Sequence, residues 1–229
     1  MRKIIIIPAY NEQLNIEKTI RDIRENAPGF DYVVIDDCSV DETRKICEAN
    51  GIKVISLPVN LGIGGAVQTG YIYAKESGYD LAVQFDGDGQ HNARYLKIMS
   101  EAMIEHSADM VIGSRFIENK GFQSSRTRRM GIAFLGLLIR VLTGRKITDP
   151  TSGMRMINRE LIDLFSEEYP KDYPEPESVV QILAKKKTVV EIPVIMNGRS
   201  GGSSSISAID SIYYMIKVTI AILIARIRK

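Results

Sequence analysis

The 229-residue chain has no tryptophan, two cysteines and two histidines. Cys38 and Cys47 are too few for a disulfide framework and suit reduced intracellular thiols, although one bridge between them stays open. No cysteine and histidine spacing typical of zinc ligands occurs. The net charge of +2 gives no reason to expect a nucleic-acid partner. The apolar run at residues 4–7 is too short for a signal peptide, so we expect a buried strand and a cytosolic N-terminus.

Short apolar runs alternate with helical patterns in the first half of the chain. The runs lie at 4–7, 32–35, 53–57, 81–85 and 110–112, and the helical patterns at 14–26, 41–50, 64–77 and 93–105. Continuous apolar strands are typical of a parallel sheet that is buried on both faces. The order predicts an α/β fold with one open, mostly parallel, Rossmann-like sheet flanked by helices. Ligands of such sheets bind beyond the carboxyl ends of the strands.

An acidic motif directly follows the apolar run at 81–85. Two carboxylates one residue apart at the end of a strand point to the same side and can reach one hard cation, such as Mg²⁺. Asp-Gly pairs also form hairpin turns, so the motif alone leaves both interpretations open. Polar or acidic residues end the first two strands as well, which favours one shared site for a nucleoside diphosphate. The three segments are Asp86-Gly87-Asp88-Gly89-Gln90, Pro8-Ala9-Tyr10-Asn11-Glu12 and Asp36-Asp37.

Two apolar helical segments with basic flanks occupy the second half, at 131–144 and 206–229. Neither offers about 20 uninterrupted apolar residues for a membrane span. We interpret them as interfacial helices on an anionic membrane surface, with core or oligomer-interface helices as the alternative. The expected organisation is a catalytic domain at 1–205, containing an amphipathic helix at 127–146, and a C-terminal membrane-associated or oligomerisation helix at 206–229.

The order of motifs resembles the family 2 glycosyltransferases with the GT-A fold, over about residues 3 to 200. The closest resemblance is to the dolichyl-phosphate mannose synthase-like branch, which attaches sugars to polyprenyl phosphates. Met154 stands where the family often has phenylalanine. Besides the three segments above, the resemblance rests on Asn60-Leu61-Gly62-Ile63-Gly64-Gly65-Ala66, Gly113-Ser114-Arg115, Asp149-Pro150-Thr151-Ser152-Gly153-Met154-Arg155, Glu191-Ile192-Pro193, Arg199 and Ser203.

The resemblance implies a role for each matching residue. It implies a nucleotide-sugar site at Pro8, Ala9, Tyr10, Glu12, Asp36, Asp37, Gly62, Asp86, Gly87 and Asp88. It implies Mg²⁺ or Mn²⁺ at Asp86, Asp88 and Gln90. His91 follows directly and could touch phosphate or metal, with a structural neighbour as the simpler interpretation. It implies an acceptor-phosphate site at Arg115, Arg128, Arg129 and Ser203, and catalytic roles for Asp88, Arg115, Arg129 and Arg199. Arg126 and Arg128 also suit contact with lipid headgroups.

Simpler interpretations stay open for several of these positions. The segment near Asn11 suits a helix cap, and Asp41 with Thr43 suits a helix start. The glycines at 62–65 also suit a simple turn. The segment 197–203 suits either a mobile lid over a diphosphate or an exposed linker.

The implied reaction is an inverting transfer of a hexose or N-acetylhexosamine from UDP-glucose or UDP-N-acetylglucosamine to undecaprenyl phosphate. We expect it at the cytoplasmic face of the membrane, in the modification of cell-wall polysaccharide side chains. A phosphate acceptor has a second pKa of about 6 and needs no strong base. Because the family often carries paired transmembrane helices and this chain has one short apolar helix, we also expect a homo-oligomer (dimer or tetramer) or a small membrane partner protein.

Three alternatives remain. A transferase acting on a glycan or other hydroxyl acceptor would need a base, and Glu175 or Glu177 is a candidate, although both also suit a helix N-terminus. A nucleotidyltransferase is disfavoured because residues 8–12 lack a glycine-rich basic phosphate loop. A catalytically silent subunit would bind its partner through the apolar helices and would bind no UDP in a metal-dependent way.

Overall fold

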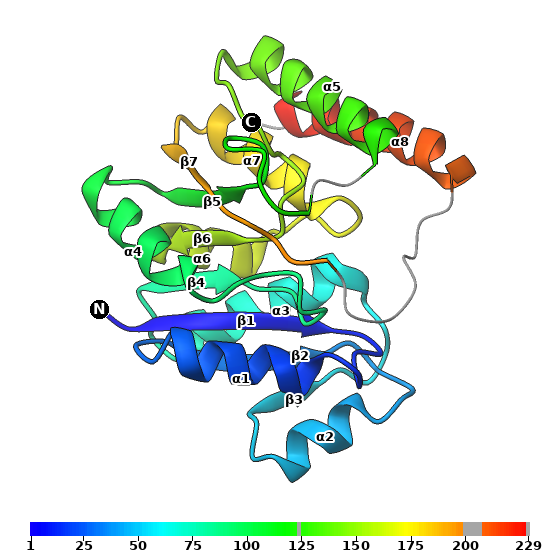
Figure 1. Ribbon diagram of the computed structural model, residues 1–229. Helices are drawn as coiled ribbons and strands as arrows, with labels where there is room; N and C mark the ends of the chain where they lie inside the picture. The colour runs from blue at the N-terminus through cyan, green and yellow to red at the C-terminus, as the bar shows by residue number, and fades with distance from the viewer. Residues whose placement is uncertain (123–124, 199–207, 228–229) are drawn as a thin grey trace.

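The computed structural model describes residues 1–122, 125–198 and 208–227. A seven-stranded sheet lies between helices in this part of the chain, with strand order β3-β2-β1-β4-β6-β5-β7 (Figure 1). The strands are β1 (Lys3–Ala9), β2 (Asp31–Asp36), β3 (Val54–Ser56), β4 (Leu81–Gln84), β5 (Met110–Ser114), β6 (Arg155–Asn158) and β7 (Val189–Pro193). The helices are α1 (Ile16–Asn26), α2 (Thr43–Ala49), α3 (Gly62–Glu76), α4 (Tyr95–Glu105), α5 (Arg126–Thr143), α6 (Arg159–Glu167), α7 (Pro174–Ala184) and α8 (Ala208–Ile227).

Burial on both faces explains the continuous isoleucine run of β1. Ile4 and Ile6 belong to the core under α3 and α6, whereas Ile5 and Ile7 belong to the core under α1 and α4. Side chains alternate across a strand, so a strand covered on both faces must be apolar at every position. The predicted α/β sheet is confirmed.

The sheet is mostly parallel, with one exception. β1 pairs in parallel with β2 and β4, and β5 pairs in parallel with β7. β6 is inserted between β4 and β5 and is antiparallel to both. The first five strands lie where the sequence predicts them, while β6 and β7 were not predicted as strands.

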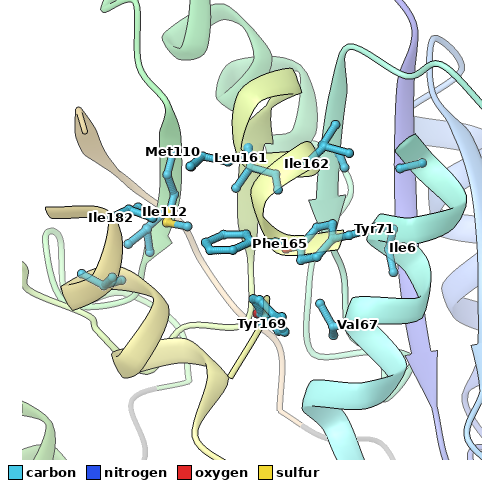
Figure 2. Close-up of a cluster of buried hydrophobic side chains, with 14 of the residues drawn as sticks. Ile6, Val67, Tyr71, Met110, Ile112, Leu161, Ile162, Phe165, Tyr169 and Ile182 are labelled. Carbon is cyan, nitrogen blue, oxygen red and sulfur yellow. The ribbon is translucent and has the colours of Figure 1, made fainter. Parts of the chain in front are cut away.

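An aromatic cluster fills the core between α3 and α6. Tyr71 and Phe165 lie with ring centroids 5.8 Å apart, and Tyr169 lies 5.3 Å from Tyr71 and 5.0 Å from Phe165 (Figure 2). The two contacts of Tyr169 are edge-on, an arrangement that aromatic rings favour. This cluster holds α3, whose first turn reaches the candidate site, against the half of the sheet that contains β6.

Helices α5 and α8 lie side by side at one end of the molecule (Figure 1). Ser125 caps α5, because its Oγ accepts a hydrogen bond from the backbone N–H of Arg128, and Gly144 ends the helix in the left-handed conformation. Arg226 of α8 donates to the carbonyl of Leu142 at 3.0 Å. No helix in the described ranges has the length and hydropathy of a transmembrane span. The predicted domain boundary at residue 205 lies outside the described residues.

Candidate active site at the carboxyl edge of the sheet

A cavity of about 240 Å³ opens at the carboxyl ends of the central strands. It is formed by the ends of β1 and β2, the first turns of α3 and the loop that follows β4. Its lining contains eight of the ten residues predicted to bind a nucleotide sugar, together with Ile63 and Ala66 of α3. The lining residues are Pro8, Ala9, Tyr10, Glu12, Asp37, Ile63, Ala66, Asp86, Gly87 and Asp88.

The acidic motif is held as a loop, and the hairpin interpretation is wrong. β4 pairs with β1 and β6, and the chain continues from the motif into α4. Gly87 packs so closely on β1 that a Cβ atom there would lie 3.2 Å from the carbonyl oxygen of Pro8. Gly89 has a φ of +75°, which glycine adopts without strain. Thr19 of α1 fixes the loop by donating to the carbonyl of Gly87 at 3.1 Å.

His91, five residues after Asp86, fixes the backbone of Asp86. The ring Nδ1 of His91 accepts the backbone N–H of Asp86 at 3.0 Å, and Nε2 lies 3.5 Å from Oδ2 of Asp86. Burial lowers the pKa of His91 to about 4, so the ring is neutral at pH 7 and carries its proton on Nε2. His91 is therefore a structural neighbour of Asp86, as predicted.

The electrostatics of Asp86 favour a bound cation. Burial raises the pKa of the Asp86 carboxyl, while a hydrogen bond from Gln84 and the charge of Arg115 act in the opposite direction. A cation at the cavity would offset the burial of this charge. The backbone of Gly153 leaves room beside the carboxylate, because a Cβ atom at this position would lie 2.7 Å from Oδ2 of Asp86.

Asp86 and Asp88 are a donor set that fits Mg²⁺ or Mn²⁺ completed by the oxygens of a diphosphate. In the described ranges, no three histidine, cysteine or acidic side chains form a cluster that would hold a metal by themselves. Gln90 donates its backbone N–H to Oδ1 of Asp88 at 3.0 Å, and its side-chain amide donates to the carbonyl of Asn197 at 3.4 Å. Metal ligation by Gln90 stays a prediction.

The loops that follow β1 and β2 are hydrogen-bonded to one another beside the cavity. The backbone N–H groups of Asn11 and Glu12 donate to the hydroxyls of Ser39 and Thr43, at 3.0 and 2.8 Å. The side chain of Asn11 accepts from the backbone of Val40 at 2.9 Å. Asn11 therefore joins the loops and does not cap α1, whose cap position is Asn15. Asp41 accepts from the backbone of Thr43 at the start of α2, as expected.

Asp37 connects this region to α3, because its Oδ1 accepts the backbone N–H of Leu61 at 2.7 Å. Asp36 is buried, and its Oδ1 accepts from the backbone of Ser39 at 3.2 Å. Asp36 is paired with Ala9 across the sheet, and Gly62 directly follows Leu61, but neither Asp36 nor Gly62 belongs to the described lining of the cavity. Ile63 and Ala66 line it instead, and the sequence shows them only as part of the segment 60–66.

None of the residues predicted to bind the acceptor phosphate belongs to the described lining of the cavity. Arg115 forms a two-point ion pair with Asp149, with Nε and Nη2 each 2.7 Å from a carboxylate oxygen. The ion pair thus fixes the guanidinium of Arg115. Phosphate binding by Arg115 stays a prediction. Arg128 and Arg129 are exposed on the first turn of α5, away from the described lining. Arg199 and Ser203, with most of the predicted lid, lie outside the described residues.

Arg155 is buried, and no local pattern in the sequence indicates its role. Its guanidinium donates to the carbonyls of Ser152, Pro150 and Glu175 and to the hydroxyl of Ser178, so it fixes the loop before β6 to the start of α7. Burial raises the pKa of Glu175, and the nearby Arg155 charge opposes this shift. The expected helix N-terminus at Glu175 and Glu177 is confirmed, because α7 begins at Pro174.

The model of the family described as "Glycosyl transferase family 2" matches residues 4–165. The chain belongs to glycosyl transferase family 2. An undecaprenyl-phosphate mannosyltransferase of Micrococcus luteus is 32% identical, with 90% of this chain and 88% of the relative aligned. A UDP-N-acetylglucosamine–dolichyl-phosphate N-acetylglucosaminyltransferase of Methanococcus voltae is 33% identical, with 83% of each chain aligned. These relatives support the polyprenyl-phosphate branch of the family.

Solved structures confirm the GT-A fold. A glucosyl-3-phosphoglycerate synthase of Mycobacterium tuberculosis, in complex with Mn²⁺, UDP-glucose and phosphoglyceric acid, superposes with a TM-score of 0.75. The match covers 98% of this chain and 79% of the other, at 19% identity. The same enzyme has also been solved with Mg²⁺ and UDP. At this level of identity the likeness shows that the chain has the same fold.

Proposed function

We propose that the protein transfers a hexose or N-acetylhexosamine, with inversion, from a UDP-sugar to a polyprenyl phosphate such as undecaprenyl phosphate. The observation that carries this proposal is the meeting of Asp86 and Asp88 with Tyr10, Glu12 and Asp37 around one cavity. Carboxylates suited to a cation and groups suited to a nucleoside thus line the same cavity. The relatives that act on polyprenyl phosphates, by their names, support the acceptor.

The donor would lie with its base near the joined loops and its diphosphate near Asp86 and Asp88. Tyr10 is 49% exposed at the cavity, so its ring is available to stack on a base. The carboxylate of Asp37 is suited to accept a base N–H or a ribose hydroxyl. Asp86 and Asp88, with Gln90 as a further candidate, would hold Mg²⁺ or Mn²⁺. When bound, this cation would neutralise the charge of the leaving diphosphate.

The acceptor would attack the anomeric carbon directly. A phosphate monoester with a second pKa of about 6 is mostly dianionic at pH 7, so it attacks without help from a protein base. The positive charges of Arg115 and Arg129, together with Arg128, which directly precedes Arg129 on α5, are suited to hold it. Ser203 and Arg199 complete the predicted set. Orientation and charge neutralisation would then supply most of the acceleration.

The lipid acceptor implies contact with a membrane, which we propose to occur at its cytoplasmic face through α5 and α8. On α5 the exposed apolar residues recur at helical spacing: Met130, Phe134, Leu137 and Val141. On α8 they are Ile216, Ile220, Leu223 and Ile224. Basic residues flank the α5 face at Arg126, Arg129, Arg140, Arg145 and Lys146. An apolar face with basic flanks is typical of interfacial helices. A homo-oligomer or small membrane partner, and a place in cell-wall polysaccharide modification, stay predictions.

The test is incubation with undecaprenyl phosphate, Mn²⁺ or Mg²⁺ and a panel of UDP-sugars, with the lipid analysed by mass spectrometry. We expect one glycolipid, formed only with metal, and its sugar would identify the donor. The Asp88→Asn variant is the matched control and should form none. If the wild-type protein makes no glycolipid from any donor, the proposed function is wrong.

Transfer to a glycan or other hydroxyl acceptor is the second candidate, and Glu175 is the observation that favours it. A hydroxyl needs a general base, and the burial that raises the pKa of Glu175 moves it toward the range where a carboxylate accepts protons well. The Glu175→Gln and Glu177→Gln variants separate the two candidates. Near-full activity in both supports a phosphate acceptor, and a loss of about a hundredfold in either supports a hydroxyl acceptor.

A further inference from the structure

The carboxylate of Glu191, in β7, binds the loop that follows α5. Its Oε2 accepts the backbone N–H of Thr148 at 2.7 Å. Its Oε1 accepts the backbone N–H of Asp149 at 2.9 Å and the hydroxyl of Thr148 at 3.0 Å. Both oxygens are thus used to fix two consecutive residues of the loop.

Asp149, whose backbone is bound by Glu191, in turn binds Arg115 through its side chain. The Asp149 carboxylate is fully buried and accepts from Nε, Nη2 and the backbone N–H of Arg115, at 2.7, 2.7 and 3.1 Å. Glu191 therefore holds the backbone of Asp149, and the side chain of Asp149 holds the guanidinium. Three segments that are distant in sequence, at 115, 148–149 and 191, become one connected unit.

The same loop connects the unit to the candidate metal site. Arg115 also donates to Oγ1 of Thr151 at 3.0 Å, and two residues later the backbone of Gly153 packs against the carboxylate of Asp86, where a Cβ atom would lie 2.7 Å from Oδ2. Burial raises the pKa of Glu191, and the hydrogen bonds from Thr148 and Asp149 act in the opposite direction. The carboxylate therefore depends on these loop residues for its stability, and the loop depends on it for its position.

We infer that Glu191 is a positioning residue for sugar transfer: through residues 148 and 149 it sets the position of the Asp149–Arg115 pair, and thereby directs the Arg115 charge at the acceptor phosphate. The inference rests on the proposed function for the identity of that anion. The Glu191–Asp149–Arg115 connection itself does not depend on it.

Glu191→Gln tests the inference, because it keeps the shape but turns an amide NH₂ toward a backbone N–H. We expect the KM for undecaprenyl phosphate to rise about tenfold to a hundredfold, since small displacements of a substrate-holding group cost this much. The Mn²⁺-dependent affinity for UDP, measured by calorimetry, should stay within about twofold. Glu191→Asp keeps both acceptor oxygens and should recover part of the loss. Glu167→Gln, at an exposed ion pair with Lys75, is the matched control and should change neither quantity.

A second measurement does not need the reaction. In NMR spectra, the Nε–H of Arg115, assigned by its loss in Arg115→Lys, should exchange slowly with water because it is bonded to Asp149. Glu191→Gln should speed this exchange about tenfold or more, and Glu167→Gln should not. Unchanged exchange of the Arg115 Nε–H in Glu191→Gln overturns the inference, whatever the reaction is.

Equal losses of the affinity for UDP and of the affinity for undecaprenyl phosphate in this variant also overturn it, because they indicate a general structural role. Absence of any glycolipid with the wild-type protein, together with the expected exchange, overturns only the acceptor assignment.

Discussion

Gly153 packs against the carboxylate of Asp86, and a Cβ atom at position 153 would lie 2.7 Å from its Oδ2 atom. The contact joins the loop before β6 to the loop after β4. Arg155 fixes the position of Gly153, because it donates to the carbonyls of Ser152 and Pro150 at 2.6 Å each. The glycine therefore leaves the space in which the Asp86 carboxylate lies, and the surrounding loop cannot easily yield to a larger residue.

Gly153→Ala should weaken metal binding while the fold is kept. The new methyl group would push Asp86 from its position, because real Cβ atoms do not approach a carboxylate oxygen this closely. We expect the affinity for Mn²⁺ in the presence of UDP to fall about tenfold, measured by calorimetry. Gly29→Ala is the control, because a Cβ atom at Gly29 would meet no atom within 4 Å. Equal metal affinity in both variants would contradict the importance of this contact.

Local patterns in the sequence predicted the first five strands and the acidic motif, because these depend on neighbouring residues. The run Ile4–Ile7 indicates a strand covered on both faces whatever packs on it. β6 was missed because it has four residues and starts with the buried Arg155, which looks like a surface residue in a sequence. Helix α7 was recognised only at its start, because prolines at 174 and 176 obscure the helical pattern.

The site was predictable where it follows strand ends and not where it depends on distant contacts. Asp86 and Asp88 come directly after β4, so their spacing indicates their direction. The pairing of Arg115 with Asp149 joins residues 34 positions apart, and no local pattern reveals it. The same holds for Gly153, which the sequence showed only as part of a motif, and for Glu191.

Asp88→Asn should remove metal-dependent activity without unfolding the protein. The amide keeps the size of the carboxylate but carries no negative charge, so it binds a divalent cation poorly. We expect turnover to fall by about a hundredfold or more and Mn²⁺-dependent UDP binding to be lost. Asp80→Asn is the matched control, because Asp80 lies directly before β4 at the opposite end of the strand. Unchanged turnover in Asp88→Asn would contradict the site map.

The two thiols should differ in reactivity with pH. Both cysteines are free, as expected, and Cys47 is fully buried. Burial, with smaller contributions from Asp36 and Glu48, raises the pKa of Cys47 to about 11, against about 8.5 in an unfolded chain. The folded protein therefore favours the uncharged thiol. This contribution to stability is present below about pH 8.5 and is lost as the pH rises through about 11.

Alkylation with iodoacetamide, followed by mass spectrometry, checks this difference because only the thiolate reacts. At pH 8 we expect Cys38, which is partly exposed, to be labelled in the folded protein, and Cys47 only after unfolding. Labelling of Cys47 in the folded state should begin as the pH approaches 11. Rapid labelling of Cys47 at pH 8 without unfolding would show that its burial is wrong.

The apolar face of α5 should be needed for membrane binding. Leu137 and Val141 are 59% and 74% exposed, and glutamate at either position would place a charge in the lipid contact. We expect Leu137→Glu and Val141→Glu each to reduce co-sedimentation with anionic phospholipid vesicles about tenfold, with metal-dependent UDP binding unchanged. Ile104→Glu is the matched control, because Ile104 is 64% exposed on α4 and lies outside this face. If the α5 variants bind vesicles like the control, the face serves another partner. A shift in their oligomeric state, measured by light scattering, would then identify that partner as a second copy of the chain.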